Sequence, residues 1–431
     1  MEKGRNAILY VEMEFYTQSS DIRSGPKMKK VIILSALIVI VLSISAVSVA
    51  VIDHSDDVPP SNEDLPAYTI TGQTDLPGNF FISFVFSKNI IMMDGKGNIV
   101  WSKHGDPDPN GVPTGYWDFK KHIVGNEIYY SYHDQNGSYD KYGIEGYAPG
   151  DRVIMDSDFN EIKRIDFEES PTVEQIYRGH PLDGHDFLLI DLDHYIMSGY
   201  VKDTVYNIPG YPQGSSVVYS YLQEVDHGDV VWEWRSVDYD ELYSLTVEDA
   251  EPTADDFGNI HTDAPDYVHF NAMRLDDDGD LICSFRHLNT ILCLDRTRMT
   301  DQIVWKLSGK GDDFHLTDDQ KSSSQHYVTV DGDRITVFDN HNITGETCVR
   351  IFTIDEGNMT ATVSTHRIEG KFSSACGSAQ LIHDNVYMLG WGRTENDAVC
   401  MCVYDFDDDR ELIRMTLDNP SNFTYRCVYY E

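Results

Sequence analysis

Histidine and arginine residues gather in three short polar clusters between Asp266 and Asn340. The clusters read Val268-His269-Phe270-Asn271, Ser284-Phe285-Arg286-His287 and Ser324-Gln325-His326-Tyr327. A neutral imidazole offers a nucleophilic lone pair, a guanidinium offers a permanent positive charge, and a second imidazole can act as an acid near neutral pH. Residues of these types can together bind an anionic group and move it.

Each cluster adjoins a short run in which apolar and polar residues alternate. The runs are interrupted by Asp276-Asp277-Asp278-Gly279 and Asp331-Gly332-Asp333, a pattern that predicts β-hairpins with tight polar turns. The His and Arg residues then lie at strand ends, where a sheet can aim several side chains at one point. The acidic turn 276–280 lacks the distal Glu of an EF-hand loop, so we expect no metal site there.

Pairs of β runs recur about six times after residue 65, each pair joined by an Asp- or Gly-bearing turn. Examples are 90–101, 224–232, 292–305, 350–363 and 402–413, with a further turn at Asp156. Most of these neighbour a second hairpin: 123–130, 187–200, 272–285, 328–338 and 381–391. Two hairpins per unit predict an all-β, six-bladed propeller of four-stranded blades. The blades of a propeller converge on a central channel, so residues far apart in sequence can meet there.

The composition is strongly acidic. Of 431 residues, 33 are Lys or Arg and 72 are Asp or Glu, for a net charge of -39. Such a surface repels nucleic acid and anionic lipid, so we exclude both as partners. No Gly-rich phosphate loop leads from a strand into a helix, which disfavours a nucleotide donor, and we expect no cofactor and no metal.

The N-terminus carries a topological signal. Residues 31–52 contain no charge, follow Lys27, Lys29 and Lys30, and precede Asp53. This pattern predicts a transmembrane anchor or signal peptide with residues 1–30 in the cytoplasm. Met28 is typical of a natural start, which would make the residues before it an upstream extension. Residues 53–65 form an acidic linker, and 66–431 form the propeller, which we expect to lie outside the cell membrane or to be secreted.

Seven cysteines occur at positions 283, 293, 348, 376, 400, 402 and 427. None has the spacing of a zinc site. We expect mostly buried thiols, with at most one disulfide among Cys376, Cys400, Cys402 and Cys427.

The polar clusters resemble those of the aryl sulfotransferase family of bacteria and archaea. The resemblance rests on H-x-N at His269, S-x-R-H at Ser284, Q-H at Gln325 and F-D-N ending at Asn340. Two more segments fit in the same order along the chain: Gly184-His185-Asp186-Phe187 and Gly377-Ser378-Ala379-Gln380. The resemblance covers roughly residues 65–431 and also implies six blades.

The resemblance implies a nucleotide-independent transfer of a sulfuryl group from an aryl sulfate to a phenol. His326 would be the nucleophile that becomes sulfated, while His185, His269 and Arg286 would bind the sulfuryl group and assist proton transfer. Asn271, on the same side of an extended chain as His269, would add a hydrogen bond to a sulfuryl oxygen.

One residue departs from the family pattern. Tyr327 stands where an Asp often follows the nucleophile. For His287, His194 and His383 we expect only structural roles.

Two alternatives remain open from the sequence. A propeller without catalysis would bind a small aromatic or glycan ligand or a partner protein. An aryl sulfohydrolase would keep the site but use water as the acceptor. The oligomeric state is not predicted.

Overall fold

The computed structural model describes residues 65–431 except 139–141, 143–145, 248–255, 261–263 and 395–397. The predicted segments 1–30 and 31–52, and all of the predicted linker 53–65 but Leu65, lie outside the described residues. Their roles stay predictions from the sequence. Among the residues that are described, no helix has the length and apolar character needed to cross a membrane.

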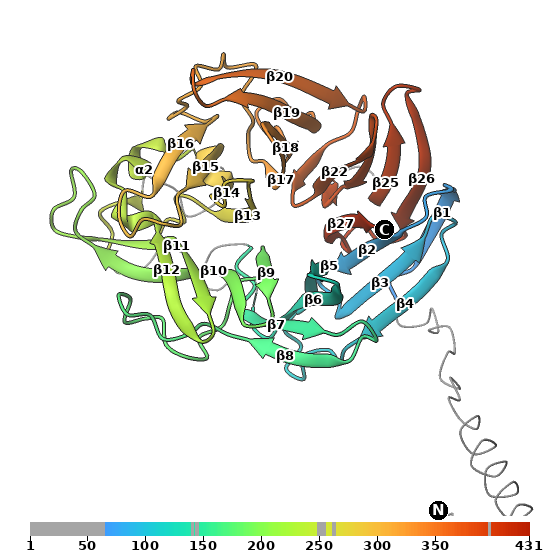
Figure 1. Cartoon of the computed structure of the whole chain (residues 1–431), viewed down its shortest axis with the longest axis horizontal. Coiled ribbons are helices and arrows are strands. Elements are labelled where there is room, and N and C mark those ends of the chain that lie inside the picture. The colour runs from blue at the N-terminus through green and yellow to red at the C-terminus, as the bar shows by residue number, and fades with distance from the viewer. Residues whose placement is uncertain (1–64, 139–141, 143–145, 248–255, 261–263, 395–397) are drawn as a thin grey trace, which may run out of the picture. The chain divides into compact units, whose positions relative to one another are not determined.

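The described chain forms a ring of six antiparallel sheets, the blades of a β-propeller (Figure 1). Blade 1 contains β27 (Thr424–Tyr430), β2 (Asn79–Phe84), β3 (Asn89–Asp94) and β4 (Ile99–His104). Blade 2 contains β5 (Tyr116–Val124), β6 (Glu127–Gln135), β7 (Gly150–Met155) and β8 (Glu161–Ile165). Blade 3 contains β9 (Phe187–Asp191), β10 (His194–Val205), β11 (Ser215–Asp226) and β12 (Asp229–Arg235).

The second half of the ring repeats this plan. Blade 4 contains β13 (Phe270–Leu275), β14 (Leu281–Phe285), β15 (Thr290–Leu294) and β16 (Ile303–Leu307). Blade 5 contains β17 (His326–Asp331), β18 (Arg334–Asp339), β19 (Cys348–Asp355) and β20 (Thr360–Arg367). Blade 6 contains β22 (Ser378–His383), β23 (Val386–Gly390), β25 (Val399–Asp405), β26 (Arg410–Leu417) and β1 (Tyr68–Gly72). The predicted all-β propeller with six blades is confirmed.

Short elements complete the described chain. They are η3 (Ser236–Asp238), α2 (Asp240–Leu245), η5 (Arg286–Leu288) and a two-stranded sheet of β21 (Ser373–Ala375) and β24 (Arg393–Thr394).

Both ends of the described chain close the ring. The C-terminal strand β27 pairs with β2 as the innermost strand of blade 1, with Tyr430 opposite Asn79. The first strand β1 pairs with β26 at the outer edge of blade 6, with Tyr68 opposite Leu417. The C-terminal strand thus completes blade 1 from the inside, and the first strand covers the outer edge of blade 6.

Aspartates form the turns of the blades. One Asp stands at or just after the end of the third strand of every blade: Asp94, Asp156, Asp226, Asp295, Asp355 and Asp405. The side chain of Asp94 accepts hydrogen bonds from the backbone N–H of Lys96 and Asn98, both at 2.9 Å. Such bonds stabilise a tight turn locally. Asp276 does the same between β13 and β14, which confirms the predicted turn at 276–280.

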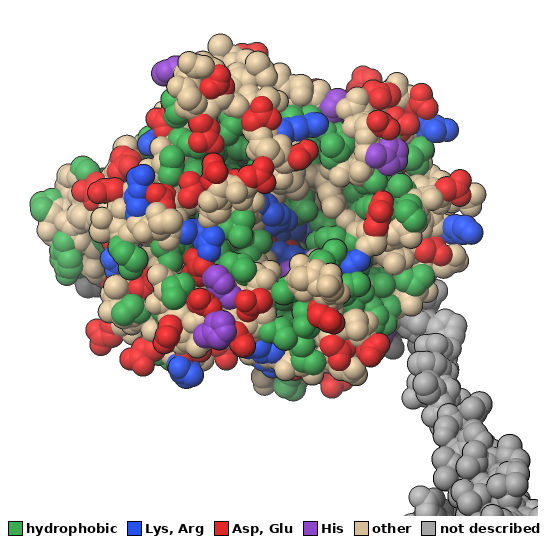
Figure 2. Space-filling view, viewed as in Figure 1, with side chains coloured by type: hydrophobic (Ala, Val, Ile, Leu, Met, Phe, Trp, Pro, Cys, Tyr) green, Lys and Arg blue, Asp and Glu red, His purple; other side chains and the backbone are tan. Residues whose placement is uncertain are grey.

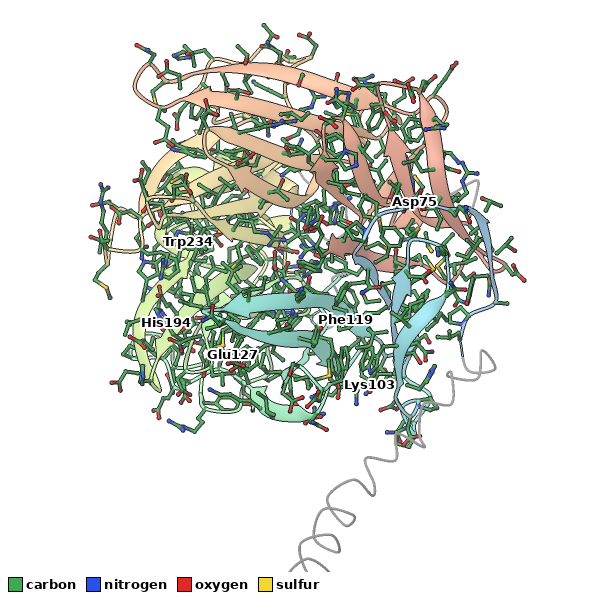
Figure 3. The ribbon with its side chains drawn as sticks, turned by 45° about the vertical axis from the view of Figure 1, so that its right-hand side comes forward. Asp75, Lys103, Phe119, Glu127, His194 and Trp234 are labelled. Carbon is green, nitrogen blue, oxygen red and sulfur yellow. The ribbon has the colours of Figure 1, made fainter. Side chains whose placement is uncertain are left out.

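Apolar side chains fill the spaces between neighbouring blades (Figure 3). Phe81 of β2 and Phe119 of β5 have ring centroids 4.8 Å apart in a cluster shared by blades 1 and 2. Trp234 of β12 and Phe285 of β14 lie 5.2 Å apart in a cluster that includes blades 3 and 4. The core is thus a series of layers between blades, and it holds the inner strands at fixed positions around the channel.

All seven cysteines belong to the described part of the chain, and all are free thiols. Six are buried and Cys376 is half-buried. The prediction of mostly buried thiols is confirmed, and the disulfide that the sequence allowed is not formed.

Candidate active site

Four predicted site residues line one cavity of about 720 Å³. His185 lies two residues before β9, His269 directly precedes β13, Arg286 opens η5 and His326 is the first residue of β17. They come from blades 3, 4 and 5, and they converge because each stands at the same end of its blade. The structure therefore brings together the four residues that the sequence placed at strand ends.

Irregular backbone aims two of these histidines. His269 has a φ of 49°, and Tyr327, directly after His326, has a φ of 54°. The pairing register shifts at both places, between Phe270 and Ala272 and between His326 and Val328. A positive φ is costly for a residue with a side chain and is retained where it re-aims a functional group.

The backbone of Gly146 lies close to two of the imidazole rings. Its φ is 95°, and a Cβ at this position would lie 3.2 Å from Cε1 of His269 and 3.8 Å from Cε1 of His185. Any side chain here would strain the backbone and displace the His269 ring. The close approach of this backbone narrows the cavity above both histidines.

His326 has a fixed tautomer. Its Nδ1 lies 2.8 Å from Oδ1 of Asn340 and 3.1 Å from the carbonyl oxygen of Ser324. The Asn340 amide nitrogen donates to the carbonyls of Ser373 and Cys376, so its oxygen must face His326. Nδ1 therefore carries the proton and Nε2 carries the lone pair. The backbone N–H of Cys376 donates to this Nε2 at 3.2 Å, which agrees with that assignment.

Burial keeps the His326 ring neutral. Loss of solvation, followed by the positive charge of Arg286, holds the pKa of His326 well below its ordinary value. A neutral imidazole with its lone pair on Nε2 is the form that can act as a nucleophile.

This lowered pKa predicts how the rate of His326 sulfation depends on pH. An ordinary histidine of pKa about 6.5 would be roughly three-quarters protonated at pH 6. Because His326 becomes half-protonated only at its lowered pKa, we expect the rate with a nitrophenyl sulfate, whose phenoxide leaves without a proton, to be flat from about pH 8 to pH 6. Stopped-flow measurement of phenoxide release tests this prediction. A rate at pH 6 of less than half the rate at pH 8 would contradict it.

His185 and His269 differ from His326 in the partner of Nδ1. His185 Nδ1 lies 2.5 Å from a carboxylate oxygen of Asp183, and His269 Nδ1 bonds to a carboxylate oxygen of Asp266. Each carboxylate also accepts the backbone N–H of its own histidine. A carboxylate stabilises the imidazolium that forms when the ring takes up a proton, whereas the Asn340 amide does so much less. Of the three histidines predicted for the site, two are therefore suited to proton transfer and one, His326, to staying neutral.

Arg286 is positioned by backbone and by neighbouring loops. Its N–H donates to the carbonyl of His269 at 2.8 Å. Asn289, in the left-handed conformation with φ 54°, ends η5, and its side-chain oxygen accepts the backbone N–H of Ser324 at 2.7 Å. These bonds join the turn that presents Arg286 to the loop that presents His326.

The charge of the cavity is opposite to that of the protein. Arg286 and Arg393 line it, and none of its described lining residues is an Asp or Glu, although the chain carries 72 of these. Its other wall is apolar and is formed by Val85, Phe86, Trp117, Pro420 and Phe423. An aromatic molecule carrying a negative group matches both walls.

Basic side chains also gather at the centre of one face of the ring (Figure 2). On the face shown in Figure 2, acidic side chains are spread over the blades, and basic side chains gather in the central hollow.

Asn271 does not have the predicted position. It is fully buried, is not among the cavity-lining residues, and donates from Nδ2 to the carbonyl of Gln325 at 2.7 Å. Its own carbonyl accepts from Tyr425 and Arg426. Instead of the predicted bond to a substrate, Asn271 fixes the backbone directly before His326.

Tyr327 points away from the cavity. The guanidinium groups of Arg274 and Arg426 lie 4.8 Å and 5.0 Å from its ring centroid. A carboxylate at this position, as the family pattern often has, would sit between the same two cations. Tyr327 replaces that ion pairing with two cation–π contacts.

A buried ion network surrounds these two arginines. Asp186 accepts from Arg274 at 3.0 Å, contacts Arg426 at 3.2 Å and bonds to Lys120. Asp118 accepts from Arg152 and Arg426, both at 2.9 Å. These cations hold the pKa of Asp186 well below its ordinary value despite full burial. The network joins blades 1, 2 and 4 with the segment before β9 beside the site.

Several residues of the site were not predicted. Asp183, Asp266, Arg393 and Cys376 had no assigned role, although Asp183 and Asp266 stand two and three residues before their histidines. His287 lines the cavity, although only a structural role was predicted for it. His194 pairs with Glu224 and His383 with Asp384, and neither lines the cavity.

Three described groups could offer ligands to a metal ion. They are Asp266, His269 and His287; Asp339, His341 and Cys348; and Asp276, Asp280 and Cys293. In the first group, hydrogen bonds occupy Nδ1 of both histidines, and in the second Asp339 pairs with Arg350 at 2.7 Å. These contacts occupy the Nδ1 atoms of the first group and the carboxylate of the second.

Comparison with known proteins identifies the family. The chain matches the family model for arylsulfotransferase (ASST) over residues 136–396. None of the curated proteins matches it. One similar solved structure is a protein of unknown function from Bacteroides caccae, 10% identical with a TM-score of 0.42, with 83% of this chain and 100% of that chain covered. Another is a periplasmic gluconolactonase from Pseudomonas aeruginosa, 8% identical with a TM-score of 0.34, with 82% and 99% covered.

These two structures are too distant to inform the site. The family model, in contrast, spans more than half of the chain and includes His185, His269, Arg286 and His326. The chain belongs to the arylsulfotransferase family.

Proposed function

We propose that this protein transfers a sulfuryl group from an aryl sulfate to a phenol through a sulfohistidine at His326. The observation that carries the proposal is the Nε2 lone pair of His326, held by Asn340 in a cavity whose described lining includes two arginines and no carboxylate. Membership of the family supports sulfotransferase activity in general.

In the first half-reaction, Nε2 of His326 attacks sulfur and displaces the Cys376 N–H that it accepts in the free protein. The N–S bond forms, the bond between sulfur and the aryl oxygen breaks, and its electron pair leaves with the aryl oxide. Arg286 neutralises the sulfuryl oxygens, and His185 or His269, each backed by a carboxylate, gives the aryl oxide a proton.

In the second half-reaction, a phenol binds where the first product left. Its oxygen attacks sulfur, its proton passes to the histidine that lost one, and the N–S electron pair returns to Nε2 of His326. The aromatic rings of Phe86, Trp117 and Phe423 in the apolar wall would hold both aryl groups in turn. No cofactor takes part in either step.

The test is the mass of the intact protein after brief exposure to an aryl sulfate at neutral pH. We expect an added SO₃ group of about 80 Da that is lost when a phenol is added. Tryptic digestion should place it on Ser322–Arg334, in which His326 is the single histidine. Release of inorganic sulfate instead of a sulfated phenol would indicate a sulfohydrolase. No added mass and no released phenol would overturn the proposal in favour of a binding propeller.

A further inference from the structure

His287 shares the cavity with the three predicted histidines but has no part in the steps above. It follows Arg286 in η5, and its ring lies against the ring of His269 with centroids 4.6 Å apart and an interplanar angle of 30°. A second imidazole so close to the site is well placed to contact a substrate.

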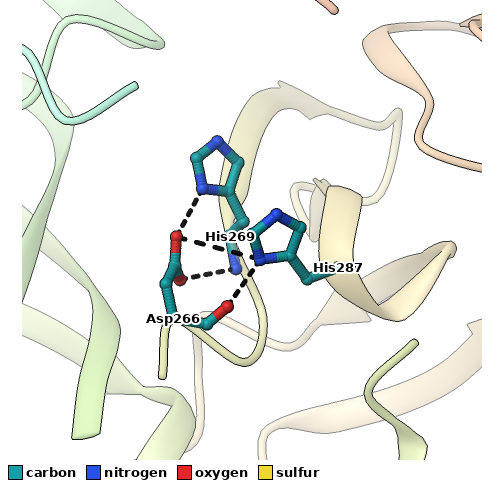
Figure 4. A group of neighbouring side chains, drawn as sticks. All are labelled: Asp266, His269 and His287. Atoms are coloured by element: carbon teal, nitrogen blue, oxygen red, sulfur yellow. Dashed lines mark hydrogen bonds and ion pairs between the residues drawn. The ribbon is translucent and has the colours of Figure 1, made fainter. Parts of the chain in front are cut away.

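Asp266 fixes the orientation of the His269 and His287 rings, because it bonds to Nδ1 of each. Its carboxylate bonds to Nδ1 of His269, and its backbone carbonyl lies 2.5 Å from Nδ1 of His287. Figure 4 shows both Nδ1 atoms turned toward Asp266 and both Nε2 atoms turned away from it. The two Nε2 atoms therefore lie side by side at the cavity wall.

The tautomer of His287 follows from its partner. A backbone carbonyl can only accept, so Nδ1 of His287 is the donor and Nε2 carries a lone pair. No described residue bonds to this Nε2. Burial, followed by the neighbouring His269, lowers the pKa of His287 to about 3, so the lone pair stays available at neutral pH.

The other cavity histidines already have roles in the proposed reaction. His185 and His269 face carboxylates and suit proton transfer, and His326 is the proposed nucleophile. An attacking phenol must direct an oxygen lone pair at sulfur while its O–H points elsewhere, and a buried O–H without an acceptor is costly. The aryl sulfate donor has no such hydrogen on its bridging oxygen. An acceptor atom beside the sulfuryl site therefore distinguishes the two substrates.

From this geometry we infer that Nε2 of His287 accepts the hydrogen bond of the un-ionised phenol as it binds, before the O–H turns to the histidine that takes its proton, and so binds the acceptor substrate without a role in binding the donor. The inference rests on the proposed function and adds an acceptor-binding residue to it. It also names the acceptor class: phenols that keep their proton at neutral pH.

The test separates the two half-reactions in wild type and in His287→Asn. Asparagine can keep a donor near the Asp266 carbonyl but has no atom at the position of Nε2. We expect the variant to form the sulfo-enzyme at a rate within about twofold of wild type, and its KM for un-ionised phenols to rise about tenfold, the effect of one hydrogen bond. For phenols already ionised at the assay pH, the KM should not rise.

Two further variants complete the design. His287→Gln offers an amide oxygen near the position of Nε2 and should recover part of the affinity for un-ionised phenols. If the Asn variant does not fold, the Gln variant compared with wild type still measures the preference between un-ionised and ionised phenols. His194→Asn, at the far end of β9 from the site, is the control and should match wild type in both half-reactions.

The outcomes distinguish this inference from the proposed function. If wild type forms no sulfo-enzyme, the proposed function fails and the inference with it. If wild type forms it but His287→Asn discharges it to all phenols as wild type does, only the inference fails. An equal rise in KM for un-ionised and ionised phenols would also overturn the role in acceptor binding. So would a slower formation of the sulfo-enzyme in the variant.

Discussion

Replacing His326 with alanine is expected to lower turnover of an aryl sulfate by roughly 10⁴-fold to 10⁶-fold, the scale at which loss of a covalent nucleophile acts in other enzymes. Two of the other cavity histidines suit proton transfer instead. His185 and His269 direct Nδ1 at carboxylates, and only His326 combines a neutral Nδ1 partner with a backbone N–H on Nε2. After exposure to an aryl sulfate, the intact mass of the variant should show no added SO₃ group.

The measurement is steady-state release of phenol together with the intact mass. His341→Ala is a matched control because His341 is also buried, lies in the loop after β18, and is not among the cavity-lining residues. It should leave turnover within about threefold of wild type, the change expected for a substitution outside the site. If His326→Ala retained more than a hundredth of wild-type turnover, another group would be the nucleophile and the proposed mechanism would be wrong.

The blades could be predicted because their determinants are local. Alternation of apolar residues and one Asp per outer hairpin specify each strand pair within about 20 residues. Asp94 shows why this signal is strong: its side chain alone satisfies two backbone N–H groups of the turn. Closure of the ring could not be predicted in the same way. Tyr68 pairs with Leu417 and Asn79 with Tyr430, and nothing near either end of the chain indicates these partners.

The site residues were predicted, but their partners were not. His185, His269, Arg286 and His326 stand out by type and by their place at strand ends. Which atom of His326 carries the lone pair depends on Asn340, directly after the next strand of the same blade, and on Cys376, just before the first strand of the following blade. Such contacts arise only once the blades are packed together.

His287 and Asn271 show the limit of reasoning from one strand. In an extended chain, residues two apart lie on the same side, which suggested that Asn271 joins His269 at the substrate. The register shift after Phe270 breaks that relation and turns Asn271 toward Gln325. At η5 the chain leaves the strand geometry, and the turn brings His287 to the cavity together with Arg286. Both positions depend on irregular backbone that simple alternation does not anticipate.

The ion partners of Asp186, which stabilise the fold, could not be predicted from the local sequence either. Asp186 follows His185 directly, yet its partners Lys120, Arg274 and Arg426 come from three different blades. Replacing Asp186 with asparagine would keep the shape of the side chain but remove the carboxylate that pairs with Arg274 and leave Lys120, Arg152 and Arg426 to share the single carboxylate of Asp118. Removing one partner of a buried ion pair costs about 3–5 kcal/mol, and we expect a loss of this size in the free energy of unfolding.

The pH dependence of this loss identifies its cause. The folded-state pKa of Asp186 lies well below its ordinary value, so the carboxylate stabilises the fold at every pH above the unfolded pKa of about 3.9 and loses this effect as the pH falls toward the folded value. The difference between wild type and Asp186→Asn should therefore be constant from pH 7 to about 5 and shrink below about 4. Denaturant unfolding followed by tryptophan fluorescence measures it. Asp193→Asn, which removes an exposed pair with Lys163, should change stability by less than about 1 kcal/mol. A loss at Asp186 as small as that would mean that the cations of the network need only one carboxylate.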